Sequence, residues 1–100
     1  MNEINKYIEK IRALCEINRV KTLYLFGSFA KGDFTDQSDI DFIVELLDTD
    51  PIEYADHYFN LKYELKSLLK RHIDLLEKKA IKNPYLINQI EQSKVAIYAN

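Results

Sequence analysis

The feature that most constrains the fold is an alternation of acidic and apolar residues between Asp39 and Val44. The segment reads Asp-Ile-Asp-Phe-Ile-Val. Side chains two residues apart on a strand share one face and lie about 6.6 Å apart along the backbone. The apolar positions Ile40, Phe42 and Val44 then form the opposite face, which can pack on a helix. The alternation therefore predicts a sheet with one covered face and one open face, and it puts both carboxylates on the open face.

The only two glycines, Gly27 and Gly32, bracket one short segment before this strand. Two glycines exclude the three-glycine dinucleotide fingerprint, and the Gly-Lys-Ser/Thr run of a Walker A loop is absent. Residues 21–26 are apolar and aromatic, which indicates a buried strand that ends where Gly27 lets the backbone approach a ligand closely. Ser28 then opens a helical turn, Ser28–Lys31. Its hydroxyl and the free N–H groups of this turn predict an anion site suited to nucleotide phosphates.

The rest of the chain alternates helices with short strands. Two cap-then-proline pairs, Asp50-Pro51 and Asn83-Pro84, mark helix starts. The expected helices cover residues 3–18, 51–70 and 84–92, and the expected strands cover residues 21–26, 39–47, 72–77 and 94–98. The long helix between the second and third strands allows these two strands to pair in parallel. We therefore expect an α+β fold, a small mixed β-sheet flanked by helices, in a single domain over residues 1–100.

The aspartates of the open face are suited to binding metal ions. Two carboxylates on one strand face repel each other unless a cation binds. Asp39 and Asp41 can converge on two ions roughly 3.5–4 Å apart, which is the spacing of two-metal phosphoryl and nucleotidyl transfer. Asp74 interrupts an otherwise apolar strand. If that strand lies beside residues 39–44, Asp74 can face the same ions and accept the proton of an attacking hydroxyl. Oxygen ligands of this kind suit Mg²⁺, here two ions, or Mn²⁺.

The spacing of these motifs resembles a known signature. Gly27-Ser28, ten further residues and then Asp-Ile-Asp resemble the DNA polymerase β-type nucleotidyltransferase superfamily. The run Gly-Ser-Phe-Ala-Lys-Gly, followed by Ser-Asp-Ile-Asp-Phe, is similar to the minimal nucleotidyltransferases (MNT). The resemblance covers roughly residues 20–77 and implies a polymerase β-like nucleotidyltransferase fold. It also implies that Gly27 and Ser28 hold the nucleotide phosphates, and that Asp39, Asp41 and Asp74 are the catalytic, metal-binding carboxylates.

The same resemblance implies an activity and a partner. Proteins of the MNT group are antitoxins encoded with HEPN-domain RNase toxins. The implied reaction transfers AMP from ATP, or another nucleoside monophosphate from its triphosphate, onto a hydroxyl, which in the antitoxin branch belongs to a tyrosine of the toxin. Lys31 stands where the family often has arginine, so it is a nucleotide-binding candidate that lacks bidentate geometry. Two alternatives stay open: a non-catalytic antitoxin that neutralises the toxin by occlusion, and nucleotidyl transfer to a small molecule.

The composition indicates which other partners are not expected and in which cellular compartment the protein is expected. Lys and Arg number 14 against 16 Asp and Glu, a net charge of −2, so direct binding to nucleic acid is not expected. The longest uncharged apolar stretch, residues 22–30, is far short of the roughly 18 residues that span a membrane, and no signal peptide is evident. Cys15 lies on the apolar side of a predicted helix, which favours an inert core thiol in a reducing, cytoplasmic location.

The histidines and a basic helical stripe receive no functional role. His57 and His72 have no second His or Cys at ligand spacing, so zinc is not expected. The stripe follows helical spacing and predicts a solvated face; it comprises Lys62, Lys66, Lys70 and Arg71.

Overall fold

The computed structural model describes residues 2–100, and Met1 lies outside the described part. Four strands form one sheet in the order β3-β2-β1-β4. They are β1 (Val20–Phe26), β2 (Ile40–Leu46), β3 (Ile73–Glu77) and β4 (Val95–Ala99). β1 pairs antiparallel with both β2 and β4, whereas β2 and β3 run parallel. The expected small mixed sheet of an α+β fold, with its parallel pair, is confirmed.

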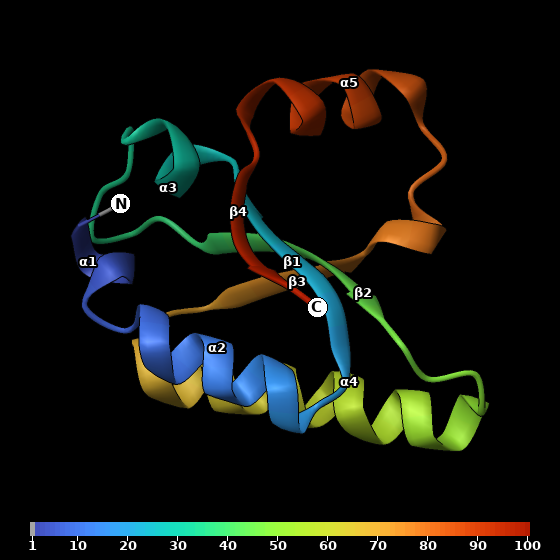
Figure 1. The fold of residues 1–100 in the computed structure, drawn as a ribbon. Helices are drawn as coiled ribbons and strands as arrows, with labels where there is room; N and C mark the ends of the chain where they lie inside the picture. The colour runs from blue at the N-terminus through green and yellow to red at the C-terminus, as the bar shows by residue number, and fades with distance from the viewer. Residues whose placement is uncertain (1) are drawn as a thin grey trace.

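The helices divide between the two faces of the sheet. They are α1 (Asn2–Asn5), α2 (Ile8–Ile17), α3 (Ser28–Lys31), α4 (Pro51–Leu69) and α5 (Pro84–Ser93), with a 3₁₀ turn η1 (Lys78–Ala80). Figure 1 shows α2 and α4 side by side below the sheet and α5 above it, with α3 following the end of β1. No helix within residues 2–100 combines the length and apolar character that a membrane crossing requires.

Local sequence signals account for the starts of α4 and α5. Asp50 accepts a hydrogen bond from the Glu53 N–H at 3.2 Å, and Pro51 occupies the first helical position of α4. Asn83 caps α5 in the same way, accepting from the N–H groups of Tyr85 and Leu86. Both starts are as predicted.

The first helix differs from its prediction. Residues 3–18 are not one helix, because α1 ends at Asn5 and α2 begins at Ile8. The Tyr7 N–H bonds to the Ile4 carbonyl at 2.9 Å and closes a turn between the two helices. No proline or glycine marks this break. Ile4 is fully buried in the core, and tertiary packing of this kind can override a local helical pattern.

The core lies between the sheet and the α2–α4 pair. As the alternation predicted, Ile40, Phe42 and Val44 point into this core. Ile43 is also buried, with 7% of its surface exposed, but it lies outside that cluster, on the opposite face of β2. The sheet therefore has one closed face and one face that carries polar and functional groups.

We expect Cys15 to resist modification until the chain unfolds. Its side chain is fully buried in the core, and burial raises the pKa of its thiol to about 12. A buried protonated thiol is a poor nucleophile. Ellman's reagent should therefore find one reactive thiol in guanidinium chloride and almost none in native buffer. Rapid labelling of the native protein would contradict this packing.

Candidate active site

Three aspartates meet at one end of the open face. Asp41 is the second residue of β2, and Asp39 directly precedes that strand. The parallel register pairs Asp41 with Asp74 of β3, so the two side chains leave the sheet on the same face. The side chains of Asp39 and Asp74 are about half exposed, at 49% and 46%. The structure thus brings together the three carboxylates that the sequence singled out.

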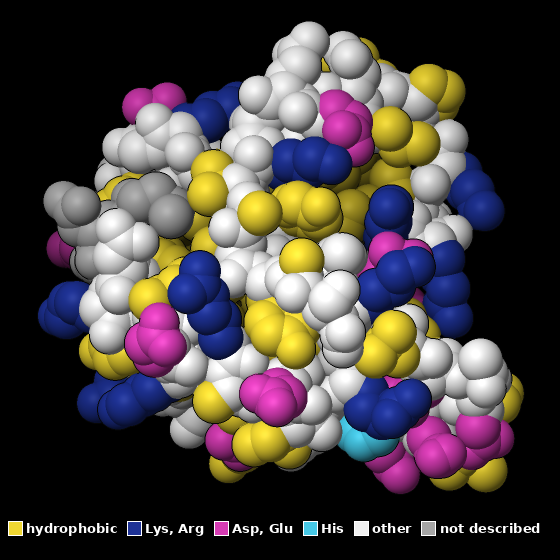
Figure 2. Space-filling model, viewed as in Figure 1, with side chains coloured by type: hydrophobic (Ala, Val, Ile, Leu, Met, Phe, Trp, Pro, Cys, Tyr) yellow, Lys and Arg dark blue, Asp and Glu magenta, His cyan; other side chains and the backbone are white. Residues whose placement is uncertain are grey.

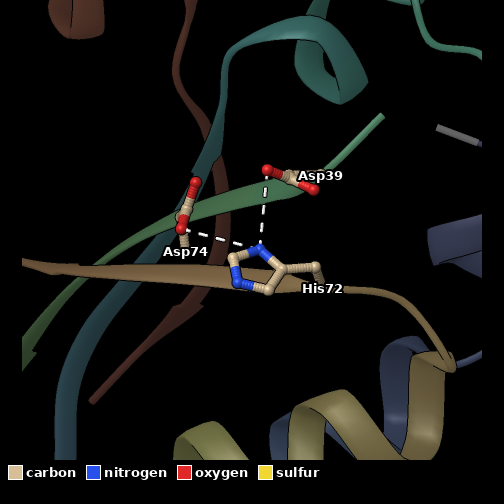
Figure 3. Close-up of side chains that lie close together, drawn as sticks. All are labelled: Asp39, His72 and Asp74. Atoms are coloured by element: carbon tan, nitrogen blue, oxygen red, sulfur yellow. Dashed lines mark ion pairs between the residues drawn. The ribbon is translucent and has the colours of Figure 1, made fainter. Parts of the chain in front are cut away.

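His72 joins these carboxylates, which the sequence analysis did not foresee. Its Nδ1 lies 3.5 Å from Asp39 Oδ2 and 3.8 Å from Asp74 Oδ1 (Figure 3). The signal was present, because His72 lies two residues before Asp74 and strand alternation puts both on one face. Each of these three residues, Asp39, His72 and Asp74, offers one atom that could bind a metal ion. These three atoms lie within 4.8 Å of one another.

The electrostatics of the cluster favour a bound cation. The pKa of Asp41 is raised to about 6, and burial is the largest cause. The hydrogen bond and charge of Asp74 and the charge of Asp39 raise the pKa further, whereas the charge of His72 lowers it. Such like-charge crowding is relieved when a positive ion binds. Carboxylate oxygens suit Mg²⁺ or Mn²⁺, and an added imidazole is compatible with the latter. The residues present therefore fit a divalent cation.

Gly27 forms the wall of the site beside Asp41. Its φ of 74° and ψ of −152° belong to a region that is essentially restricted to glycine. A Cβ at this position would overlap Asp41 Oδ2 and lie 3.3 Å from Asp41 Cγ. The backbone therefore approaches the carboxylate as closely as the absence of a side chain allows. The sequence predicted a close approach of this turn to a ligand; the structure shows a close approach to Asp41, and the phosphate-binding role of Gly27 stays a prediction.

α3 begins at Ser28, directly after this close approach. The Gly27 and Ser28 carbonyls accept from the N–H groups of Lys31 and Asp33, at 3.2 and 3.0 Å. The first N–H groups of a helix have no partner within it, so the α3 start faces the carboxylate end of the sheet with free donors. Lys31 lies in the last turn of α3, in a hollow that it shares with Gln89, Gln92 and Ser93 of α5.

Arg71 fixes the loop between α3 and β2. Its Nη1 donates to the carbonyls of Thr35 and Ser38 at 3.0 and 3.1 Å, and its guanidinium stacks 4.9 Å from the Phe29 ring centroid. The prediction that Arg71 belongs to a solvated face was therefore wrong. The partners lie more than thirty positions away in sequence, which helical spacing cannot reveal. Arg71 thus supports the loop that leads into Asp39.

We expect Arg71→Ala to loosen this loop without unfolding the sheet. Hydrogen bonds to a charged donor contribute about 1.5–3 kcal/mol each when buried, and less at a surface such as this one. Amide hydrogen exchange in residues 35–38 should therefore accelerate, while β1 and β2 stay protected. Lys66→Ala removes an exposed positive charge from α4 and is the matched control. Equal exchange in the two variants would contradict the role given to Arg71.

The fold and the site together define a class of protein. β1 ends in a glycine turn, and beside it β2 and β3 present three carboxylates, which is the kind of donor set that two-metal phosphoryl transfer uses. The family described as "Nucleotidyltransferase domain" matches residues 8–97. The chain belongs to this family, and it is a nucleotidyltransferase.

Relatives and solved structures agree with this assignment. Two Methanocaldococcus jannaschii proteins, each proposed to be a protein adenylyltransferase, are 32% and 36% identical over 97% of both chains. A toxin–antitoxin complex with AMP-PNP superposes with a TM-score of 0.72 at 28% identity, covering 93% of this chain and 73% of that one. The resemblance to the MNT group of toxin–antitoxin pairs is therefore confirmed.

Two further structures extend the comparison. A Shewanella oneidensis complex of a tri-AMPylated HEPN toxin with its MNT antitoxin has a TM-score of 0.65 at 26% identity, covering all of this chain and 74% of that one. A protein described as a minimal nucleotidyltransferase superposes with a TM-score of 0.76, covering 92% of this chain and 90% of that one. Its identity of 23% supports the fold alone.

Proposed function

We propose that this chain is a cytoplasmic antitoxin, formed by a single domain over residues 1–100, that transfers AMP from ATP to a tyrosine hydroxyl of a HEPN-domain toxin. The observation that carries the proposal is the register of Asp41 with Asp74, which gathers three carboxylates beside the Gly27 turn. The tri-AMPylated toxin bound to a similar antitoxin supports the choice of acceptor. ATP as donor is supported by the AMP-PNP complex of another similar chain.

Each residue of the cluster has a role in this proposal. Asp39 and Asp41 would hold two Mg²⁺ ions together with Asp74. When bound, the ions would neutralise the triphosphate and activate the attacking hydroxyl. Gly27 lets the turn lie against Asp41, which would bring the phosphates close to the backbone, and Ser28 would offer its hydroxyl and N–H to them. Lys31 adds a positive charge at the end of α3.

The reaction is an in-line displacement at the α-phosphorus of ATP. The acceptor oxygen forms a bond to this phosphorus as the bond to the bridging α–β oxygen breaks, and pyrophosphate leaves with that oxygen. Asp74 accepts the hydroxyl proton, because it lies at the half-exposed edge of the cluster. Gly27 and Asp41 position the phosphate that is attacked, and holding two reactants in line is itself a large part of such catalysis.

Labelled ATP tests the proposal directly. The protein is incubated with α-labelled ATP, Mg²⁺ and the HEPN-domain product of a neighbouring gene. We expect the label on a toxin tyrosine, and its loss in an Asp39→Ala, Asp41→Ala double variant. An Asp33→Ala, Asp36→Ala double variant is the matched control, because it removes two exposed carboxylates from the loop that leads into Asp39 and β2.

Each other outcome has a distinct meaning. Label transfer that survives the Asp39→Ala, Asp41→Ala double substitution would overturn the two-metal mechanism. Neutralisation of the toxin without transfer would favour the occluding, non-catalytic antitoxin. Label on an added small-molecule alcohol but not on the toxin would favour the small-molecule alternative.

A further inference from the structure

α4 carries exposed apolar side chains on the side that faces away from the sheet. Ile52, Phe59 and Tyr63 keep 73%, 64% and 68% of their surface exposed. Leu61 and Leu65 of the same helix are fully buried in the core. At about 100° per residue, Phe59 and Tyr63 lie roughly 160° around the helix axis from Leu61. A row of exposed apolar side chains on one element is typical of an interaction surface.

These side chains follow the spacing of a helix-pairing seam. From Ile52, the outward positions are alternately four and three residues apart and pass through Asp56, Phe59, Tyr63 and Lys66. This alternation has the repeat of about 3.5 residues that keeps one row of side chains against a second helix. These five residues form the outer stripe of α4. Within residues 2–100, neither Asp56 nor Lys66 has an ion-pair partner. Both charges are therefore available to a second chain.

The outer stripe is complementary to itself when one copy is reversed. Asp56 precedes Phe59 by three residues, and Lys66 follows Tyr63 by three. If two α4 helices lie antiparallel, with a two-fold axis between Phe59 and Tyr63, each Phe59 faces the partner's Tyr63. Each Asp56 then faces the partner's Lys66, as the self-complementarity of a two-fold interface requires. A parallel pair would place like charges against each other, so the charges favour the antiparallel arrangement.

Charges that flank the outer stripe favour the same arrangement. Asp50 and Glu53 lie at the start of α4, and Lys62 and Lys70 lie in its second half and at its C-cap. Figure 2 shows acidic side chains gathered at the lower right, where α4 begins in Figure 1. Glu64 is an acidic residue of the second half, but it lines a hollow that it shares with residues of α2. Antiparallel pairing brings the acidic end of each helix to the basic end of its partner, and it also opposes the two helix dipoles.

We propose that two copies of this chain form a dimer through the outer stripes of α4, packed antiparallel about a two-fold axis. This assembly goes beyond the proposed function and does not depend on it. Aromatic side chains bury about 150–250 Å² each, and the two stripes together contribute the rings of Phe59 and Tyr63 from both copies. With the flanking residues, the interface is on the order of 1,000 Å² in total, at the low end for specific interfaces. The dimer is therefore expected to be weak, with a dissociation constant in the micromolar range.

Pairing through α4 leaves both candidate active sites accessible. Figure 1 shows α4 on the side of the sheet opposite α5, and the buried residues of α4 belong to the core cluster on that side. Asp41 and Asp74 project from the other face of the sheet. The two carboxylate clusters of the dimer therefore face outward, away from the interface. Each copy then has a site open to its own acceptor.

Charge reversal at exposed positions tests this pairing. Sedimentation velocity across a concentration series measures the dimerisation of the isolated chain. Asp56→Lys and Lys66→Asp each turn two attractive contacts of the dimer into repulsive ones, so each should weaken dimerisation about tenfold or more. An equimolar mixture of the two variants should recover the dimer, because every facing pair then carries opposite charges. Glu64→Lys makes a comparable change of charge on the side of α4 that faces α2; it is the matched control, and no effect is expected.

A further variant tests the apolar part of the stripe. Phe59→Ser removes an aromatic ring that is mostly exposed, so it should weaken dimerisation about tenfold or more with little change in melting temperature. A wild type that stays monomeric at millimolar concentration would overturn the proposal. So would a mixture of the two charge variants that fails to dimerise although each is folded. A monomeric wild type whose toxin binding is weakened by Phe59→Ser would assign the stripe to the toxin instead. AMP transfer is measured separately, and its absence would overturn the proposed function without affecting the dimer.

Discussion

Asp41→Asn is expected to abolish AMP transfer while raising the melting temperature of the metal-free protein. Asp41 is partly buried, and its raised pKa of about 6 records this burial, the hydrogen bond and charge of Asp74 and the charge of Asp39. Removing its charge relieves this repulsion. Because Asp41 is only partly buried, solvent screening leaves a gain on the order of 1 kcal/mol, or about 4–8 °C in a domain of this size.

The same substitution removes a carboxylate oxygen to which the proposed function assigns metal binding. Metal ions supply several kcal/mol of transition-state stabilisation in such reactions, so the rate should fall by about 10³-fold or more. Asp36→Asn neutralises an exposed carboxylate in the preceding loop and should change neither activity nor stability appreciably. The two aspartates therefore form a matched pair.

Thermal melting with EDTA and with Mg²⁺ checks both halves of this prediction. A ligand that binds only the folded state raises the melting temperature, so Mg²⁺ should stabilise the wild type and have little effect on Asp41→Asn. A metal-free variant that melts below the wild type would show that Asp41 contributes structural hydrogen bonds that outweigh the repulsion. Retained AMP transfer would remove Asp41 from the catalytic set.

Most of the fold was predictable because its signals are local. The alternation at Ile40, Phe42 and Val44 determines which face of β2 enters the core, and each cap-then-proline pair marks a helix start. The break between α1 and α2 was not predictable in this way. It depends on how Ile4 reaches the core, which only the folded arrangement determines.

In the candidate site, too, the residues with local sequence signals were predictable and those with long-range contacts were not. Asp39 and Asp41 follow from strand alternation, and Asp74 follows once β2 and β3 pair in parallel. His72 was within reach of the same rule, because it is the first residue of the predicted strand 72–77 and shares a face with Asp74. Arg71 was not, because its loop contacts join residues that are distant in sequence.

The hollow between the open face of the sheet and α5, about 140 Å³ in volume, could not be predicted from the sequence. An amphipathic pattern predicts that Ile87 and Ile90 face the sheet, but it does not predict how far from the sheet the helix lies. Sequence patterns therefore identify groups that do chemistry more readily than the spaces between packed elements.

Gly27→Ala is expected to cost both stability and activity, whereas Gly32→Ala should cost stability alone. Both glycines have a positive φ, of 74° and 82°, where an L-residue with a side chain is strained by about 1–3 kcal/mol. Only at Gly27 would the added methyl group also overlap Asp41 Oδ2. At Gly32, apart from its chain neighbours, no atom of the described residues lies within 4 Å of a Cβ.

The pair of variants isolates the close approach from the backbone strain. Displacing the Asp41 carboxylate by about 1 Å is enough to reduce turnover about 10²-fold, so AMP transfer by Gly27→Ala should fall by at least that factor. Its melting temperature should also lie below that of Gly32→Ala, since the overlap adds to the strain that both share. Turnover measured at saturating ATP, alongside thermal melts, gives both quantities. Equal loss of activity in the two variants would contradict the role given to the contact between Gly27 and Asp41. The loss would then come from backbone strain in the segment 27–32.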